Sequence, residues 1–141
     1  MELDSDIIIV GGGLNGSLLA IAAAKIGFST IVLDSKGNHQ DELNSFDGRS
    51  YALAASSVRL LKNLDIFEDI RGCSQPILDI EILDGKLVQG PSQFSLHFDN
   101  NEIHNGPLGY MVEDRFIQKT LFAQILATNQ IDYKFDSKVI E

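Results

Sequence analysis

The sequence has little cysteine and no long hydrophobic run. Its single cysteine, Cys73, excludes a disulfide within the chain and is typical of a reducing compartment. The longest apolar stretch, Leu18 to Ala24, is much shorter than the roughly 20 residues that span a membrane. Glu2, Asp4 and Asp6 occupy the N-terminal region where a signal peptide needs basic residues. These absences predict a cytoplasmic protein.

Positive charge is also scarce. The 141 residues have a formal net charge of −9, which argues against nucleic acid or an anionic membrane surface as the main partner. An acidic protein can still bind a phosphate compound through backbone N–H groups. The three histidines, His39, His97 and His104, lack the spacing of metal ligands, and no catalytic set can be assigned around them. We therefore predict no metal site and leave the catalytic residues unassigned.

A glycine-rich segment follows the first hydrophobic run. Ile7 to Val10 is continuous and β-branched, which predicts a parallel strand buried on both faces. Gly11, Gly13 and Gly16 then fit the pattern G-x-G-x-x-G. Such a loop needs one glycine for its tight turn, one where the backbone approaches a pyrophosphate, and one where helix and strand pack closely. The N-terminus of the following helix would attract the pyrophosphate.

The next elements complete a β-α-β unit. We expect a helix over about 14–26 with Gly27 as its C-cap, then a strand over 30–33 that ends on Asp34. The interval between Gly16 and Asp34 holds 17 residues, close to the spacing of an acid that binds the ribose of a dinucleotide. A carboxylate there accepts hydrogen bonds from ribose hydroxyls and disfavours a 2′-phosphorylated cofactor. The alternative for Asp34 is a solvated residue at a strand end.

The remaining sequence predicts an antiparallel region and a return to the core. Residues 35–48 are polar and predict a long loop, which is typical of a functional segment. After this loop we expect a helix from Ser50, a short helix at 65–71, and strands at 77–83 and 94–98 around an Asp84-Gly85 hairpin turn, with a further turn at 99–101. A helix capped by Asp114 and a strand at 131–135 follow. The apolar residues of that helix are Ile117, Leu121, Ile125 and Leu126. The fold class is therefore α/β, with a Rossmann-like FAD/NAD(P)-binding β-α-β core and an inserted antiparallel β region.

Two arginines stand where expected helices begin. Arg49 ends the polar loop, and Arg115 follows the expected cap of the later helix. A fixed guanidinium at either place could pair with a diphosphate through planar, charge-assisted hydrogen bonds. Arginine at a helix start is more often solvated, so the residues alone leave both interpretations open.

Three motifs together resemble a known family. The glycine segment from Asp6 to Gly16 and the later segment Phe46-Asp47-Gly48-Arg49, with Ala52-Leu53, Ser57 and Leu60-Leu61 after it, are similar to the FAD-dependent aromatic hydroxylases. The segment from Leu108 to Arg115, followed by Leu121, resembles the ubiquinone-biosynthesis branch, the 2-polyprenyl-phenol hydroxylases. Members of that family run to several hundred residues. We therefore expect residues 1–141 to be the N-terminal FAD-binding portion of a larger flavoprotein, a truncated piece that is inactive on its own.

The resemblance implies roles for individual residues. In the family, the glycine loop holds the FAD pyrophosphate, an acid after the second strand binds the adenosine ribose, and two arginines lie along the diphosphate and the ribityl chain. Asp34 stands where the family usually has Glu, which keeps the charge but shortens the reach. The residues that the resemblance assigns to cofactor binding are Gly11, Gly12, Gly13, Leu14, Asn15, Gly16, Asp34, Ser35, Arg49 and Arg115.

The resemblance also implies an activity. In that family NAD(P)H reduces the FAD, and O₂ is then used to hydroxylate a phenolic ring, here a polyprenylated phenol in ubiquinone biosynthesis. By family alone, it implies peripheral association with the inner membrane or with a biosynthetic complex. Two alternatives stay open: a stand-alone regulatory NAD-binding module, and a related FAD-dependent reductase or halogenase, since downstream residues decide the reaction.

Overall fold

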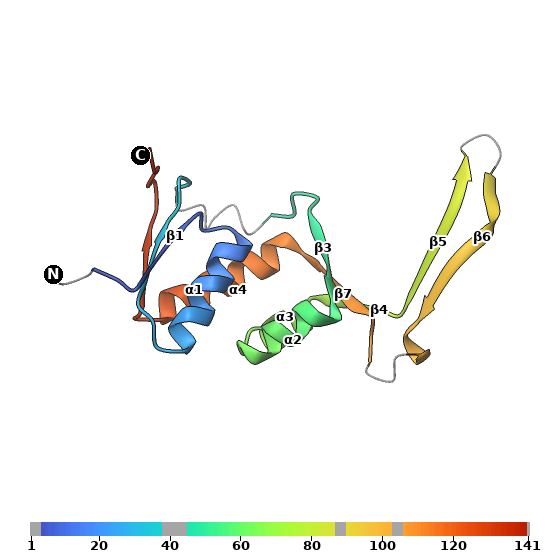
Figure 1. Cartoon of the computed structure of the whole chain (residues 1–141), viewed down its shortest axis with the longest axis horizontal. Coiled ribbons are helices and arrows are strands. Elements are labelled where there is room, and N and C mark those ends of the chain that lie inside the picture. The colour runs from blue at the N-terminus through green and yellow to red at the C-terminus, as the bar shows by residue number, and fades with distance from the viewer. Residues whose placement is uncertain (1–3, 38–44, 87–89, 103–105, 141) are drawn as a thin grey trace.

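The computed structural model describes residues 4–37, 45–86, 90–102 and 106–140 (Figure 1). The polar loop expected at 35–48 is therefore described only at its two ends, and His39 and His104 lie outside the described residues. The described elements form two small sheets, four helices that pack between and beside them, and a separate hairpin.

The first sheet is parallel and contains the predicted β-α-β unit. Strands β1 (Ile7–Val10), β2 (Thr30–Leu33) and β8 (Ile131–Lys134) lie in the order β1-β2-β8. Helix α1 (Leu14–Lys25) connects β1 to β2, and helix α4 (Asp114–Ala127) leads into β8. Gly27 follows α1 with a φ of +96°, the left-handed conformation expected of a C-terminal glycine. The predicted Rossmann-like core is confirmed.

The prediction that β1 is buried on both faces is wrong. Ile9 is 6% exposed, whereas Ile8 and Val10 are 65% and 68% exposed. Helices α1 and α4 pack against each other and lie on the same side of the sheet (Figure 1). The described chain therefore supplies no second layer, and the apolar side chains on the other face of β1 contact solvent.

The second sheet is antiparallel and was only partly foreseen. Strands β3 (Ser50–Ala54), β7 (Gly109–Glu113) and β4 (Ser74–Ile77) lie in the order β3-β7-β4, with helices α2 (Ala55–Asn63) and α3 (Phe67–Arg71) beside them. The helix expected from Ser50 begins only at Ala55, because residues 50–54 pair with β7. Strand β4 was not predicted at all. Its sequence is short and contains Pro76, so only the distant partner β7 defines it as a strand.

The inserted hairpin projects from the rest of the molecule (Figure 1). Strands β5 (Asp79–Lys86) and β6 (Gly90–Asp99) are antiparallel, and a 3₁₀ turn (Asn100–Glu102) follows at the turn expected around 99–101. Asp84-Gly85 is not the hairpin turn as predicted. It lies within β5, where the register is irregular between Leu83 and Gly85, and pairing continues to Lys86 and Gly90.

One core joins the two sheets, and α4 contributes its central stripe. Ile117, Leu121 and Ile125 are each 2% exposed, as their helical spacing predicted. Leu126, which was expected in the same stripe, is 63% exposed because it lies on the outer side of the helix. The core also contains Ile9 and Val32 from the first sheet, and Val112, Ile66 and Phe67 from the region of the second.

Phe67 offers a test of this core. Its side chain is fully buried and meets the ring of Tyr110 edge-on, with the ring centroids 5.0 Å apart. We expect Phe67→Ala to lower the free energy of unfolding by about 3–5 kcal/mol, because the lost contacts leave a cavity. The matched control is Phe94→Ala on the hairpin, where Phe94 is 84% exposed; it should change stability by less than about 0.5 kcal/mol. Equal losses in urea denaturation of the two variants would contradict the assignment of the core.

Candidate cofactor site

The predicted glycine loop connects β1 to α1 with the expected turn geometry. Gly11 has a φ of +99°, which a residue with a side chain rarely adopts, and its N–H donates to the Leu33 carbonyl at 2.8 Å. Gly13 is the N-cap of α1 and supplies no capping side chain, and the first turn of the helix contains no acid. The N–H groups and the positive dipole end of α1 could therefore receive an anion, because no capping side chain of the described residues occupies that place.

The three pattern glycines differ in what surrounds them. A Cβ atom at Gly16 would lie 1.9 Å from the Gly11 carbonyl oxygen, so Gly16 is required for the close approach of helix and loop. A Cβ atom at Gly13 would meet nothing within 4 Å. No protein atom of the described chain demands glycine at position 13. The open space above it fits a ligand that approaches the backbone closely, which is the role the pattern predicts.

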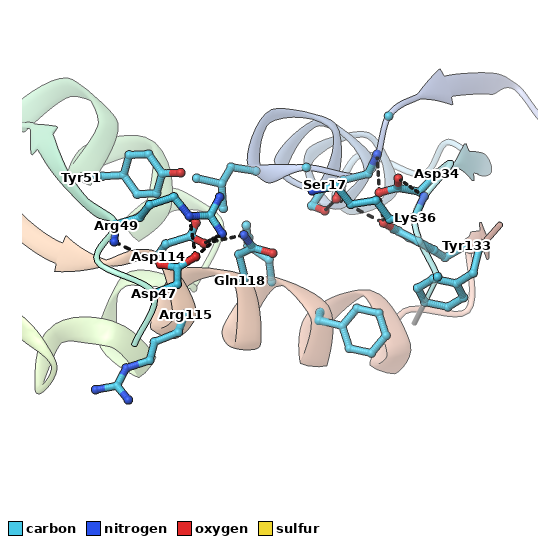
Figure 2. A pocket seen from close by; sticks show the side chains of 18 of the residues that line it. Ser17, Asp34, Lys36, Asp47, Arg49, Tyr51, Asp114, Arg115, Gln118 and Tyr133 are labelled. Atoms are coloured by element: carbon cyan, nitrogen blue, oxygen red, sulfur yellow. Dashed lines mark hydrogen bonds and ion pairs between the residues drawn. The ribbon is translucent and has the colours of Figure 1, made fainter. Parts of the chain in front are cut away.

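A cavity of about 740 Å³ runs along α4 beside this loop. Figure 2 shows Asp34, Lys36 and Tyr133 at one end of the cavity, and Asp47, Arg49, Tyr51 and Asp114 at the other. Gly11, Gly12, Gly13 and Leu14 lie along its wall between these two groups. The volume is within the range of small-molecule sites, and both ends carry polar side chains that could orient a long ligand.

Asp34 lies at the end of β2, as predicted, and its carboxylate is tied to the loop. Oδ2 accepts hydrogen bonds from the Gly12 N–H at 3.1 Å and from the Tyr133 hydroxyl at 2.8 Å, while Oδ1 accepts one from the Lys36 N–H at 3.0 Å. Partial burial alone would raise the pKa of Asp34, but the hydrogen bonds from Lys36, Tyr133 and Gly12 together lower it below its ordinary value. The carboxylate is therefore charged at neutral pH and faces the cavity as a hydrogen-bond acceptor.

An aromatic cluster stands beside Asp34. The Tyr133 ring from β8 lies 4.6 Å from that of Phe135 and 6.2 Å from that of Phe122 on α4, measured between ring centroids. All three rings line the cavity. Burial, followed by the hydrogen bond to Asp34 and the negative charge of Asp34, raises the pKa of Tyr133, so its phenol stays protonated. This end of the cavity therefore combines an anionic acceptor with apolar aromatic surface.

The pairing of β3 with β7 brings Arg49 to Asp114 at the other end. Arg49 immediately precedes β3 and Asp114 immediately follows β7, so the antiparallel register sets them side by side. The Asp114 N–H donates to the Arg49 carbonyl at 3.0 Å, and the Arg49 guanidinium pairs with Asp114 Oδ2 at 3.0 Å. A hydrogen bond from Nε to Asp47 at 2.6 Å holds the guanidinium from the other side. The hydrogen bond to Asp47 and, to a smaller extent, the negative charge of Asp114 raise the pKa of Arg49.

Asp114 is a buried carboxylate with an unmet acceptor. Its side chain is 3% exposed, and Oδ2 accepts from Gln118 at 2.7 Å as well as from Arg49. Oδ1 is buried and has no hydrogen-bond partner among the described residues. Burial, and then the nearby Asp114 charge, raise the pKa of Tyr51, whose phenol also lines the cavity. Such an unsatisfied acceptor fits a ligand that brings a hydroxyl or N–H donor. Asp114 is not the helix cap that the sequence predicted, since Glu113 occupies the N-cap position.

The other predicted residues take less central positions. Arg115 lines the cavity, but its Nε donates to Glu113 at 2.6 Å and its guanidinium lies against the rings of Phe116 and Phe46. In Figure 2 that guanidinium points away from Arg49. Asn15 and Gly16 line a second, more apolar groove next to the cavity, and Leu14 lines both. Ser35 is exposed and lines neither. Their roles stay predictions.

Sequence reasoning missed several cavity residues. Tyr133, Phe122 and Phe135 were assigned only to a helix and a strand, and Asp114 only to a cap. Alternation of Tyr133 and Phe135 on a strand gave the available signal, because it places both rings on one face. Nothing local could reveal Asp114, whose burial depends on β3. Within the described ranges there is no cluster of metal-binding side chains and no helix long and apolar enough to cross a membrane.

Comparison with curated proteins finds relatives that include hydroxylases of ubiquinone biosynthesis. The chain is 38% identical over 121 residues to the ubiquinone hydroxylase UbiL of Rhodospirillum rubrum, a match that covers 86% of this chain and 27% of that protein. It is 28% identical over 138 residues to the 3-demethoxyubiquinol 3-hydroxylase of Escherichia coli, covering 96% of this chain and 34% of the relative. The chain thus spans about a third or less of the length of these relatives. No protein-family model matches it. These matches confirm the resemblance to the ubiquinone-biosynthesis hydroxylases.

Solved structures agree on the fold. The p-nitrophenol 4-monooxygenase PnpA of Pseudomonas putida superposes with a TM-score of 0.72 at 20% identity, over 100% of this chain and 33% of that one. PqsL of Pseudomonas aeruginosa, described as a probable FAD-dependent monooxygenase, also gives a TM-score of 0.72, at 14% identity, over 97% of this chain and 34% of that one. Nearly the whole of this chain therefore has the same fold as about one third of each of these longer chains.

The hydrogen bonds of Asp34 predict an acid-dependent loss of stability. Because the folded state lowers the pKa of Asp34 below 3.8, its contribution is present above about pH 4 and is lost as the pH falls through the folded pKa. We expect Asp34→Asn to be less stable than the wild type at pH 7, with the difference shrinking as the pH falls from about 4 toward 2. Urea denaturation over that range measures it, with Asp132→Asn on the surface of β8 as control. A difference that stays constant with pH would contradict this account.

Proposed function

We propose that this chain, a relative of the flavin-dependent hydroxylases of ubiquinone biosynthesis, forms the half of an FAD site that holds adenosine and diphosphate. The observation that carries the proposal is the space above Gly13, where a Cβ would meet no protein atom, beside a helix N-terminus without a capping side chain. That geometry accommodates a phosphate group against the backbone. The relationship to flavin-dependent hydroxylases supports FAD as the cofactor, since the glycine loop alone would suit NAD equally.

Within this site the glycine loop and Asp34 would bind different parts of the cofactor. The backbone of Gly11, Gly12, Gly13, Leu14, Asn15 and Gly16 would hold the diphosphate, using the N–H groups and the dipole of α1. Asp34, which lies with Lys36 and Tyr133 at one end of the cavity, would accept hydrogen bonds from the adenosine ribose, with Ser35 beside it. The aromatic rings near Asp34 offer apolar surface for the adenine base.

Arg49 and Asp114 would serve the remainder of the cofactor. Arg49 is held between two carboxylates, so it presents a fixed guanidinium to the cavity while the group as a whole carries no net positive charge. The unpartnered Oδ1 of Asp114 would accept a donor from the polyhydroxylated chain that links the diphosphate to the flavin ring. Arg115 is placed one residue further along α4 and would contact the same portion of FAD after its side chain turns from Glu113.

The proposed reaction of the whole protein is hydroxylation of a polyprenylated phenol in ubiquinone biosynthesis. FAD supplies the redox chemistry when bound, taking electrons from NAD(P)H and using O₂ as the oxygen donor. The residues of this chain bind and orient the cofactor; none of them is assigned to the reacting atoms. A prenylated substrate resides in the lipid bilayer, so we propose a cytoplasmic protein that associates peripherally with the inner membrane or with other enzymes of that synthesis.

The surfaces of the fold support a longer protein around this chain. Strand β1 forms one edge of the parallel sheet, and Ile8 and Val10 are exposed on its outer face. The hairpin presents the paired side chains Ile80, Ile82, Leu96 and Phe98, which are 41–60% exposed. Apolar surface of this kind is normally covered. Together with the fraction of the relatives' length that the chain spans, this supports residues 1–141 as the N-terminal part of a larger flavoprotein.

Gly13→Val tests the proposed site separately from the fold. Gly13 has φ −66° and ψ −171°, which valine adopts readily, and a Cβ there has open space. We expect the variant to keep wild-type thermal stability and to lose detectable binding of ADP in titration calorimetry, because the side chain fills the place of the diphosphate. Gly16→Ala is the contrasting variant, and it should lose about 1–3 kcal/mol of stability through its clash with Gly11. A folded Gly13→Val chain that binds ADP as tightly as the wild type would refute the site.

A further inference from the structure

The hydroxyl of Tyr133 occupies the junction between Asp34 and the glycine loop. Its oxygen lies 2.8 Å from Asp34 Oδ2 and 3.2 Å from the Gly12 carbonyl oxygen, although Tyr133 is 99 residues from Asp34 and 121 from Gly12 along the chain. Figure 2 shows the Tyr133 side chain reaching Asp34 from β8, on the opposite side from α1. One phenol therefore contacts both groups proposed to recognise the ribose and diphosphate.

The hydrogen bonds at Asp34 limit what else the carboxylate can accept. A carboxylate offers about four acceptor positions. Three are used by donors from the protein: the N–H groups of Gly12 and Lys36 and the hydroxyl of Tyr133. About one position is left for a ligand hydroxyl, and the phenol oxygen, which donates to Asp34, keeps lone pairs that can accept from a second hydroxyl. The pair thus offers acceptors to a diol and repels a phosphate.

Tyr133 also explains the middle glycine of the loop. A Cβ atom at Gly12 would lie 1.7 Å from the Tyr133 hydroxyl oxygen and 2.6 Å from Asp34 Oδ2. Glycine at position 12 is therefore required by the tyrosine, whereas a Cβ atom at Gly11 or Gly13 would meet nothing within 4 Å, and only Gly13 has a φ that other residues adopt. Neighbouring rings of Phe122 and Phe135 restrict the phenol, so the hydroxyl is held in place rather than free to rotate away.

We propose that Tyr133 is a positioning residue for the ribose subsite, which fixes the Asp34 carboxylate so that the site selects an adenosine ribose with free 2′- and 3′-hydroxyls over a 2′-phosphorylated one. This inference rests on the proposed function and extends it to specificity. Tyr133 acts through Asp34 and the loop, and through its own oxygen as an acceptor toward the second hydroxyl.

The test compares ligands with and without ribose hydroxyls. Titration calorimetry measures Kd for ADP and for 2′,3′-dideoxy-ADP with the wild type and with Tyr133→Phe. We expect Tyr133→Phe to weaken ADP by about fivefold to tenfold and to leave dideoxy-ADP unchanged, because only ADP uses the fixed acceptors. The variant should also narrow the preference for ADP over its 2′-phosphorylated form. Tyr110→Phe on β7, outside the cavity, is the matched control and should change neither Kd.

The outcomes separate the two proposals. If the wild type fails to bind ADP, the proposed function fails, and this inference with it. If the wild type binds ADP but Tyr133→Phe weakens both ligands equally or neither, the cofactor site stands and the role of Tyr133 is refuted. Where Tyr133→Phe lowers stability, a double-mutant cycle with Asp34→Asn decides: coupling between the two substitutions in ADP affinity supports positioning, and additive losses overturn it.

Discussion

Burial of helix α4 is the constraint on which both sheets and the site depend. The helix begins directly after β7 of the second sheet and leads into β8 of the first, and its stripe of Ile117, Leu121 and Ile125 lies in the shared core. Asp114 stands at its first turn and Phe122 about two turns later. The packing of one helix therefore sets the distance between the two polar ends of the cavity, and Leu121 of the packed stripe also lines the cavity wall.

The sequence predicted those parts of the fold whose causes are local. The β-branched run, the glycine pattern and the C-terminal Gly27 define the first β-α-β unit within about 30 residues, and the structure confirms it. The predictions were wrong where pairing with a strand far away in the sequence determines the secondary structure. Ser50 to Ala54 reads as helical because apolar residues continue into α2, yet β7, more than 50 residues away, draws this segment into a sheet. Similarly, the exposed face of β1 could not be read from composition, since it depends on where both helices pack.

In the candidate site, too, the residues within one local motif could be predicted, and those placed by distant strand pairing could not. Gly11, Gly13, Gly16 and Asp34 are recognisable because the phosphate loop and its acid lie within one β-α-β unit. Tyr133 reaches Asp34 only because β8 pairs with β2, and Asp114 reaches Arg49 only because β7 pairs with β3. Each of these contacts joins segments far apart in sequence, and each involves a residue type that is common at surfaces. The resemblance to the hydroxylases singled out Arg49; the structure adds the buried acid that holds it.

The central claim is that the cavity beside the glycine loop holds the adenosine diphosphate half of FAD. The most direct measurement is the change in backbone amide chemical shifts when isotope-labelled chain is titrated with ADP. The account predicts the largest shifts at Gly11 to Gly16 and at Lys36, whose N–H donates to Asp34, with little change on the hairpin around Ile82. Absence of any shift at millimolar ADP, or shifts concentrated on the hairpin, would contradict it.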